Sequence, residues 1–363
     1  MATKTIRVDL AERSYDVLVG PAMLDRLGGL TAGLDGASSA VVIADETVAG
    51  LYGEAAVDRL EAEDLATNLL TFPSGESSKT IAAYGRLMDG LLTRDPPIDR
   101  GTVIVALGGG VTGDLAGFVA ATALRGLRFI QCPTTLLADV DSSVGGKTGV
   151  DHPAGKNLIG AFHQPRTVLI DVETLKTLPD EELRNGLAEC VKHAVIRDAT
   201  LLDLIADNAA AYFARDPDAL TDLVARNVAI KAAVVAGDER EKGERAHLNF
   251  GHTIGHAVEA DAGYALGHGQ AVALGMVVEN EVAVARGLLD RAVADRVRNV
   301  LDTLGLPTRM PGLEIDRLWP IMLRDKKSRA GKPHFILPTA LGRVAIYGDV
   351  TREETAPALG ALS

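Results

Sequence analysis

The chain has 363 residues, of which 47% are hydrophobic, and this length and composition predict a globular protein of two domains. Its 49 acidic residues outnumber its 37 basic residues, and the resulting net charge of -12 argues against a nucleic-acid partner. No stretch approaches the roughly 18 consecutive apolar residues of a membrane span, and the N-terminus MATKTIRVDL lacks the apolar core of a signal peptide. We therefore expect a cytoplasmic protein with no membrane partner.

The N-terminal half alternates short β-branched runs with stretches of helix length, which predicts βαβ units and a mostly parallel, Rossmann-like sheet over residues 1–178. The runs are TIRVDL, YDVLVG, and the segments 39–45, 67–72, 102–110, 128–135 and 167–171. After residue 178 the pattern changes to long amphipathic helices, with strand-like runs returning only at HFILPT and RVAIYG. We expect a mainly helical domain over residues 179–363, starting at TLPDEE, and an active site in the cleft between the two domains.

A glycine-rich turn follows the run TVIVAL. Gly108, Gly110 and Gly113 fit the pattern G-x-G-x-x-G, and Asp114 comes next. Glycines at such a turn let backbone amides approach a pyrophosphate at a helix N-terminus. The acid that usually follows about twenty residues later is missing, so this is not the ordinary dinucleotide fingerprint.

Acidic residues that could hold a ribose occur earlier in the chain instead. Asp45 ends the run SAVVIAD, and Glu76 lies in the turn PSGESSKT with Lys79 close by. A helix-capping or turn role accounts equally well for either acid alone.

The segment 136–165 is dense in glycine, lysine and small polar residues and has no clear hydrophobic period, which suggests a functional loop. Lys147, Lys156 and Asn157 could bind an anion there, since an ammonium group is a compact charge suited to phosphate. A solvated loop with surface lysines is the alternative.

Histidines gather in the stretch RAHLNFGHTIGHAVE and just after it. His252 and His256 lie four residues apart in a helical pattern, His268 follows a glycine-rich break, and Glu189 stands upstream in LAECVKHAVIRD. Three of these four residues could hold a divalent metal, and two histidines with one carboxylate are a common catalytic zinc set. The alternative is a histidine pair that packs or caps a helix.

Several long segments resemble the 3-dehydroquinate synthase family in order and spacing. They include GGGVTGDLAGFVAA, the segment from RGLRFIQCPTT to GAFHQP, LAECVKH, DEREKGERAHLNFGHTIGHAVE and HGQAVALGM. The family belongs to the sugar phosphate cyclases and shares its fold with metal-dependent polyol dehydrogenases. The resemblance implies a homodimeric shikimate-pathway enzyme that converts 3-deoxy-D-arabino-heptulosonate 7-phosphate to 3-dehydroquinate and phosphate, using NAD and zinc or cobalt.

The resemblance also implies a role for individual residues. The metal ligands would be Glu189, His252 and His268. The catalytic residues would be Lys147, Lys192, Lys231, Arg245, Asn249 and His256. The remaining substrate contacts would be Arg125, Asp141, Lys156, Asn157 and a lysine of the pair Lys326 and Lys327. The cofactor site would comprise Asp45, Glu76, Lys79, Gly108, Gly109, Gly110, Asp114, Thr134, Thr135, Lys156, Thr177 and Leu178.

The chain departs from the family pattern in a few places. Asp139 stands where glutamine is frequent, and Gln270 replaces the glutamate of the usual HGE, which could loosen the surroundings of His268. Other cyclases typically differ at Asn249 and His256, so keeping both favours dehydroquinate formation. The rival classes are a polyol dehydrogenase, which has no need of so many basic residues, and a silent binding protein, which would usually have lost one of them.

Overall fold

The computed structural model describes residues 3–241, 243–263, 265–324 and 333–363. Its chain forms two compact units. Unit 1 comprises Met1–Leu178 and Arg215–Arg240, and unit 2 comprises Pro179–Ala214 and Glu241–Ser363. The first boundary lies at the step where the helical domain was predicted to begin. Residues 215–240 belong to unit 1. The prediction had placed them in a second domain that was continuous from residue 179 to residue 363.

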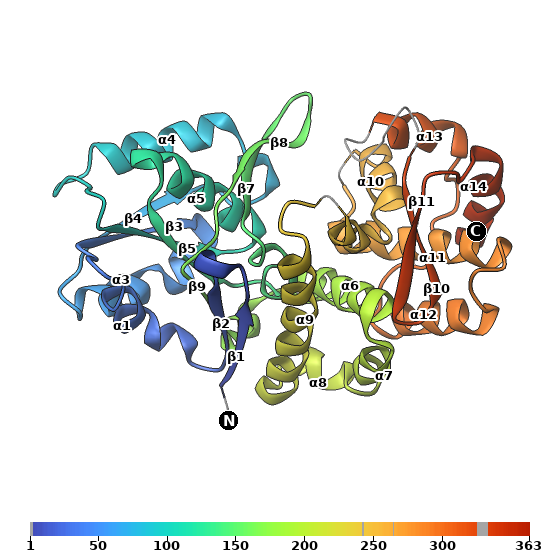
Figure 1. Cartoon of the computed structure of the whole chain (residues 1–363), viewed down its shortest axis with the longest axis horizontal. Helices are drawn as coiled ribbons and strands as arrows, with labels where there is room; N and C mark the ends of the chain where they lie inside the picture. The colour runs from blue at the N-terminus through green and yellow to red at the C-terminus, as the bar shows by residue number, and fades with distance from the viewer. Residues whose placement is uncertain (1–2, 242, 264, 325–332) are drawn as a thin grey trace. The chain divides into compact units, whose positions relative to one another are not determined.

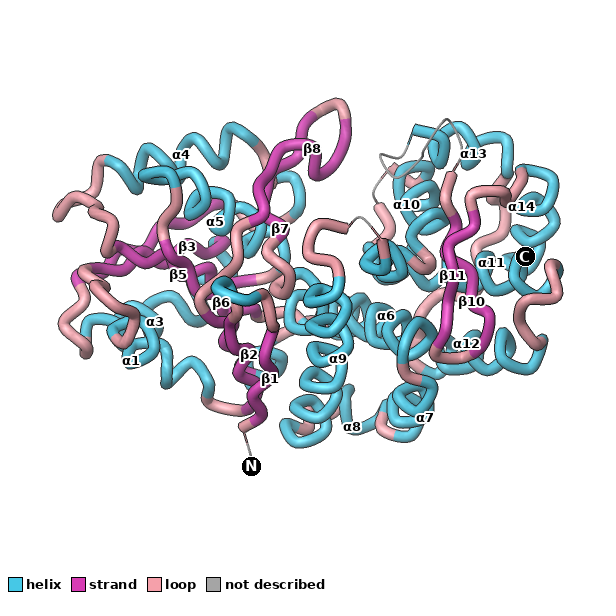
Figure 2. The backbone as a smooth tube through the Cα atoms, in the orientation of Figure 1, coloured by secondary structure: helices cyan, strands magenta, loops and turns pink. Residues whose placement is uncertain are grey.

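Unit 1 is built on a seven-stranded sheet in which only β1 runs antiparallel to its neighbour (Figures 1 and 2). In spatial order the strands are β1 (Lys4–Val8), β2 (Tyr15–Gly20), β9 (Thr167–Asp171), β6 (Arg128–Pro133), β5 (Thr102–Gly108), β3 (Ser39–Asp45) and β4 (Ala66–Phe72). The main helices of the unit are α1 (Leu27–Ala32), the short α2 (Glu46–Val48), α3 (Glu54–Glu61), α4 (Ile81–Leu92), α5 (Gly110–Thr122) and α9 (Pro217–Gly237). A mostly parallel sheet confirms the predicted fold class for this half.

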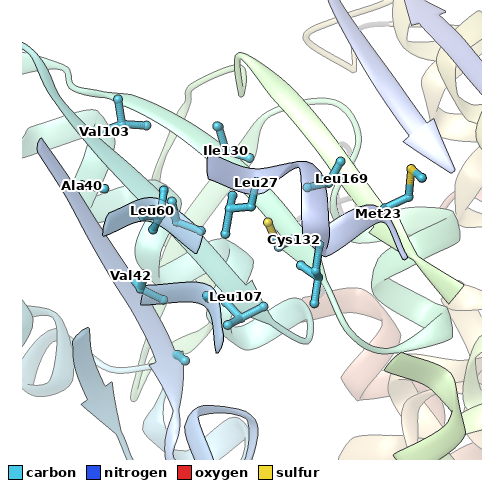
Figure 3. Packing of buried hydrophobic residues seen from close by; sticks show 14 of the residues in the cluster. Met23, Leu27, Ala40, Val42, Leu60, Val103, Leu107, Ile130, Cys132 and Leu169 are labelled. Carbon is cyan, nitrogen blue, oxygen red and sulfur yellow. The ribbon is translucent and has the colours of Figure 1, made fainter. Parts of the chain in front are cut away.

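Alternate residues of the central strands bury both faces of the sheet. Val42 and Ile130 point to the face covered by α1 and α3, where Leu27 and Leu60 pack against them (Figure 3). Their sequence neighbours, such as Ile43, lie in a second cluster with α4 and α5. Parallel strands covered on both sides read as continuous apolar runs, which is why their bounds could be predicted closely.

Helix α9 packs against β1 and β2 in unit 1. Two ion pairs connect the N-terminal segment to α9 and to Glu239, which lies just past the end of that helix. Arg13 donates two hydrogen bonds to Glu239, at 2.7 and 2.8 Å, and Lys4 lies 2.5 Å from Asp222. The helix therefore completes unit 1 although it follows about forty residues of unit 2 in the sequence.

The segment predicted as a loop over residues 136–165 contains a β-hairpin. Strand β7 (Lys147–His152) pairs with β8 (Gly155–Phe162), and Gly149 lies opposite Gly160. The paired glycines and the exposed polar residues break the alternation of apolar side chains by which a strand is recognised. The prediction of a loop was therefore wrong for this part of the segment, because residues 147–162 form paired strands.

In its described residues unit 2 is mainly helical, as predicted, and the two predicted strand-like runs pair in a two-stranded sheet (Figure 1). Helix α11 (His268–Ala285) packs on α6, α10, α12, α14 and β10 and is buried along most of its length. Its neighbours include α6 (Asp180–Arg197), α10 (His252–Asp261), α12 (Arg291–Thr303) and α14 (Arg352–Leu359). The unit also contains α7 (Ala199–Asp207), α8 (Ala209–Phe213), α13 (Ile315–Arg324), β10 (Phe335–Ala340) and β11 (Arg343–Tyr347). Among the described residues, no helix has the length and apolar character needed to cross a membrane.

Candidate metal centre and cofactor site

Three helices of unit 2 bring Glu189, His252 and His268 together. Glu189 lies in the middle of α6, and the two histidines are the first residues of α10 and α11. One ligand atom from each residue lies within 4.8 Å of the others. The Nε2 atoms of His252 and His268 are 3.7 and 3.6 Å from Oε1 of Glu189.

These separations suit ligands that share one ion. They are longer than an ordinary hydrogen bond, whereas ligands about 2.0 Å from a tetrahedral zinc ion lie roughly 3.3 Å apart. Two imidazoles and a carboxylate are also ligands that zinc and cobalt accept. The residues present therefore fit a divalent metal.

A close approach of α10 and α11 sets the spacing of the two histidines. A Cβ atom on Gly275 would lie 1.9 Å from the carbonyl oxygen of Gly251, so only glycine permits this contact. Gly251 has a φ of 79° just before His252, and its amide donates to Oε2 of Glu279 at 2.8 Å. The start of α10 is thus held against α11 at the point where His252 emerges.

His252 is oriented by the backbone two residues before it. Its Nδ1 atom lies 3.0 Å from the carbonyl oxygen of Phe250, which leaves Nε2 directed toward Glu189. A donor bond at one ring nitrogen fixes the tautomer that presents the other nitrogen to a metal.

The centre combines a buried cation with buried carboxylates. Lys192 forms an ion pair with Glu189, and both side chains are 1% exposed. Burial lowers the pKa of His268, but the carboxylates of Glu189 and Glu259 outweigh it and raise the pKa to about 9. His268 therefore interacts electrostatically with the same carboxylate, Glu189, that pairs with Lys192.

His256 belongs to a second group of potential ligands. It lies with Glu259 and His268, again within 4.8 Å, and its ring centre is 5.3 Å from that of His252. All four candidate ligands from the sequence thus lie close together. The structure adds Glu259, which sequence reasoning missed although its spacing of three from His256 puts both on one helix face.

The basic residues expected to hold the substrate differ in their surroundings. Arg245 is 1% exposed, and Asn249, on the same 3-10 helix (Glu244–Asn249), donates to Glu241 at 3.2 Å. In unit 1, Lys231 of α9 lies 2.8 Å from Oδ1 of Asp141. Lys147, at the start of β7, is exposed.

Two further expected substrate residues lie in unit 1, Arg125 at the end of a short 3-10 helix and Asn157 near the start of β8. Arg125 and Asn157 are exposed, and both have positive φ values, of 64° and 56°. Lys326 and Lys327 lie outside the described residues.

The expected cofactor residues lie at the carboxyl edge of the sheet in unit 1. Gly108 ends β5 with a φ of 155°, and a Cβ there would lie 2.4 Å from Oγ1 of Thr112. Thr134, just past β6, donates its amide to the carbonyl oxygen of Gly108 at 3.1 Å. Gly109 caps α5, which begins at Gly110, and Thr135 lies beside it. This is the position at which parallel sheets bind nucleotides.

Asp45 and Thr177 border the same edge. Asp45 caps α2 by accepting from the amides of Thr47 and Val48, so the capping role considered for it is present. The side chain of Thr177 lies 2.6 Å from the Tyr52 hydroxyl, and the carbonyl oxygen of Leu178 accepts from Arg215 at 2.8 Å.

Lys79 links the remaining expected residues of unit 1. Its ammonium lies 2.6 Å from Asp114 and 2.5 Å from the amide oxygen of Asn157. Burial lowers the pKa of Lys79, but Asp114 and its neighbours outweigh this and raise it, so the charge is retained. Lys156 lies 3.8 Å from Glu76.

Asp139 is an unexpected feature of the same unit. It is fully buried in the π-helix Ala138–Ser142, and its carboxylate oxygens have no hydrogen-bond partner among the described residues. Burial, reinforced by Asp171, raises its pKa well above the usual range. An uncharged amide at this position would avoid that penalty.

The family models described as 3-dehydroquinate synthase N-terminal and C-terminal match residues 69–185 and 186–328. A 3-dehydroquinate synthase of Symbiobacterium thermophilum is 46% identical over 347 residues, which are 95% of this chain and 96% of the relative.

Two solved cyclases have the same fold. A 2-epi-5-epi-valiolone synthase of Streptomyces hygroscopicus subsp. jinggangensis, with NAD+ and Zn2+ bound, superposes with a TM-score of 0.87 at 33% identity over 98% of both chains. A 2-deoxy-scyllo-inosose synthase with carbaglucose-6-phosphate, NAD+ and Co2+ gives a TM-score of 0.84 at 26% identity, over 96% of this chain and 95% of the other. The fold is thus that of the sugar phosphate cyclases. Within that class, the chain belongs to the 3-dehydroquinate synthase family.

Proposed function

We propose that the chain is a 3-dehydroquinate synthase, an NAD- and metal-dependent lyase of the shikimate pathway. It converts 3-deoxy-D-arabino-heptulosonate 7-phosphate to 3-dehydroquinate and phosphate, a step toward the aromatic amino acids. The observation that carries the proposal is the match to synthases of this name, at 43% to 46% identity over nearly the whole chain. The cluster of Glu189, His252 and His268 also supports the proposal, because these residues could bind the metal that the reaction requires.

The metal residues are assigned as Glu189, His252 and His268, and the ion as zinc or cobalt. When held by these residues, the ion would supply Lewis-acid chemistry, which would make a substrate hydroxyl more acidic. The ion pair of Lys192 with Glu189 supports a role for Lys192 beside the same hydroxyl.

The cofactor is NAD, held by the glycine-rich turn and the residues along the carboxyl edge of the sheet in unit 1. When bound there, NAD would supply reversible hydride transfer, which would give the substrate a temporary ketone and leave no need for a second redox partner. The temporary ketone acidifies the neighbouring C–H bond, and this permits elimination of phosphate. Ring opening and aldol closure complete the conversion.

The basic residues are assigned to the two anionic groups of the substrate. The planar fork of Arg245 suits the carboxylate, and the ammonium groups of Lys147, Lys156 and Lys231 suit the phosphate. Asn249 and His256 are proposed to contact the reacting ring, and other cyclases typically differ at both positions. The remaining substrate contacts are assigned to Arg125, Asp141, Asn157 and a lysine of the pair Lys326 and Lys327.

Catalytic rather than stoichiometric use of NAD tests the proposal. With enzyme, zinc and NAD all well below the heptulosonate phosphate, released phosphate should exceed the NAD present many times over while the absorbance of NADH stays flat. NADH that accumulates in proportion to consumed substrate would instead indicate a polyol dehydrogenase. Flat absorbance without phosphate release would contradict this substrate assignment.

The assembly is proposed to be a homodimer, in line with the family resemblance of the sequence. Light scattering coupled to gel filtration measures the mass directly. A mass near that of one 38.1 kDa chain would contradict the dimer.

A further inference from the structure

Glu259 lies on the far side of the His268 ring from the proposed metal ligands. Its Oε2 atom is 3.5 Å from Nδ1 of His268, while Nε2 of the same ring is 3.6 Å from Glu189. Glu259 is 7% exposed and projects from α10, seven residues after His252. One imidazole is thus placed between two carboxylates, one at each ring nitrogen.

His268 depends on such a contact more than His252 does. The ring of His252 is already oriented by the carbonyl oxygen of Phe250 at 3.0 Å, and its side chain is only 10% exposed. The side chain of His268 is 35% exposed, and the residue begins its helix. The ring of His268 therefore has more rotational freedom than that of His252, and a side chain that fixes it has a larger effect.

The residue that replaces the usual glutamate after His268 does not take this role. The side chain of Gln270 accepts a hydrogen bond from the amide of Gly267 at 3.0 Å and so caps the start of α11. The anionic group beside Nδ1 belongs to Glu259 instead. A carboxylate that accepts the Nδ1 proton of a metal-bound histidine fixes the ring and increases its basicity.

We propose that Glu259 is a positioning residue for the metal centre, which holds His268 through its Nδ1–H so that Nε2 faces the ion. The inference rests on the metal site proposed above. Glu259 would contact a metal ligand and would not bind the metal itself. The alternative is that His256, Glu259 and His268 form a second metal site.

Metal affinity tests this role without relying on turnover. Glu259→Gln keeps the shape of the side chain and removes its charge, and Glu259→Ala removes both. Asp261→Asn is the matched control, because Asp261 lies on the same helix and pairs with Arg317 at 3.2 Å. Zinc dissociation constants from chelator competition, and the number of bound ions from elemental analysis, are compared with those of the unaltered protein.

Loss of an orienting carboxylate typically weakens metal binding about 10-fold to 100-fold. We expect Glu259→Gln to lie near the lower figure, Glu259→Ala near the higher, and Asp261→Asn to match the unaltered protein, all with one ion bound. In the zinc-loaded protein, the Nδ1 proton of His268 should give a slowly exchanging NMR signal that shifts in Glu259→Gln. Thermal unfolding of the metal-free variants separates this effect from a general loss of structure.

Three results would overturn the inference. Unchanged affinity in Glu259→Gln would show that the carboxylate does not act on His268, while the metal site itself would stand. Loss of a second bound ion, with the first unaffected, would make Glu259 a ligand of a separate site. Absence of zinc binding by the unaltered protein would overturn the metal site and this inference together.

Discussion

Lys192 and Glu189 form a buried ion pair one helical turn apart, at the point where two histidines converge on the same carboxylate. The lysine thus supplies a fixed positive charge next to the proposed metal position. Loss of one partner of a buried pair leaves the other charge without compensation.

Lys192→Met is expected to destabilise the metal-free protein by about 3 kcal/mol, because the Glu189 carboxylate then loses its nearest cation and depends on the more distant ring of His268, 3.6 Å away. Zinc should recover part of this loss, since the ion neutralises the same carboxylate. Urea unfolding with and without zinc measures both. Lys176→Met is the control, because Lys176 pairs with Glu173 at the same spacing on the surface and should cost less than about 1 kcal/mol. Equal losses in the two variants would contradict the prediction.

His252→Ala and His268→Ala are each expected to abolish tight zinc binding, since two remaining ligands compete poorly with water. His256→Ala should retain one equivalent of zinc and lose turnover. Elemental analysis of the purified proteins decides the matter. A His256→Ala protein without metal, beside a His268→Ala protein that retains it, would show that the ligand assignment is wrong.

Lys147→Ala is expected to lower kcat/KM at least about 30-fold while NAD affinity stays unchanged, because the partner of this ammonium is the sugar phosphate. The figure corresponds to roughly 2 kcal/mol, the lower end for a charge-assisted contact buried on binding. Steady-state kinetics and a separate NAD titration provide the two values. NAD affinity that falls as far as kcat/KM would place Lys147 in the cofactor site.

Asp139→Asn is expected to stabilise the protein at pH 8 by about 1 kcal/mol or more. The pKa of Asp139 is raised in the folded state, so its protonated form is favoured there. The stability of the unaltered protein therefore falls as pH rises above the unfolded pKa near 3.9 and through the folded pKa. Urea unfolding at pH 5 and pH 8 should show an advantage of the variant that grows with pH.

Asp99→Asn serves as the control of opposite sign. A hydrogen bond from Ser38, with backbone donors, lowers the pKa of Asp99, so this carboxylate stabilises the fold above its unfolded pKa. The variant should be less stable at pH 8, and the deficit should vanish in acid. A pH-independent effect of Asp139→Asn would contradict the burial argument.

The sheet of unit 1 could be predicted closely because buried parallel strands are continuous apolar runs. β2, β3 and β9 begin and end at the predicted residues. The hairpin β7–β8 could not be predicted, because Gly149 and Gly160 have no side chains and so interrupt the alternation of apolar and polar residues that marks a strand. The return of α9 to unit 1 was equally hidden, because an amphipathic helix does not reveal which partner its apolar face will meet.

The proposed metal ligands could be named from the sequence, because their residue types and spacing are visible there and match the pattern of the family. Glu259 could not, since its role depends on the ring of His268 reaching it from another helix. Gln270 illustrates the same limit. Its place in the sequence suggested a contact with His268, whereas its side chain bonds to the backbone of Gly267.

The alternation of the chain between the two units restricts how the protein can be divided. A fragment ending at Leu178 would lack α9 and with it the ion pairs of Glu239 and Asp222 to the N-terminal segment. It would also expose the apolar surface that β1 and β2 bury against that helix. Unit 1 therefore cannot finish folding on the ribosome until about residue 240 has emerged, after the first helices of unit 2. A rearranged chain that joins residues 215–240 directly to Leu178, with residues 179–214 moved to the start of unit 2, would release this constraint and allow each unit to be produced alone.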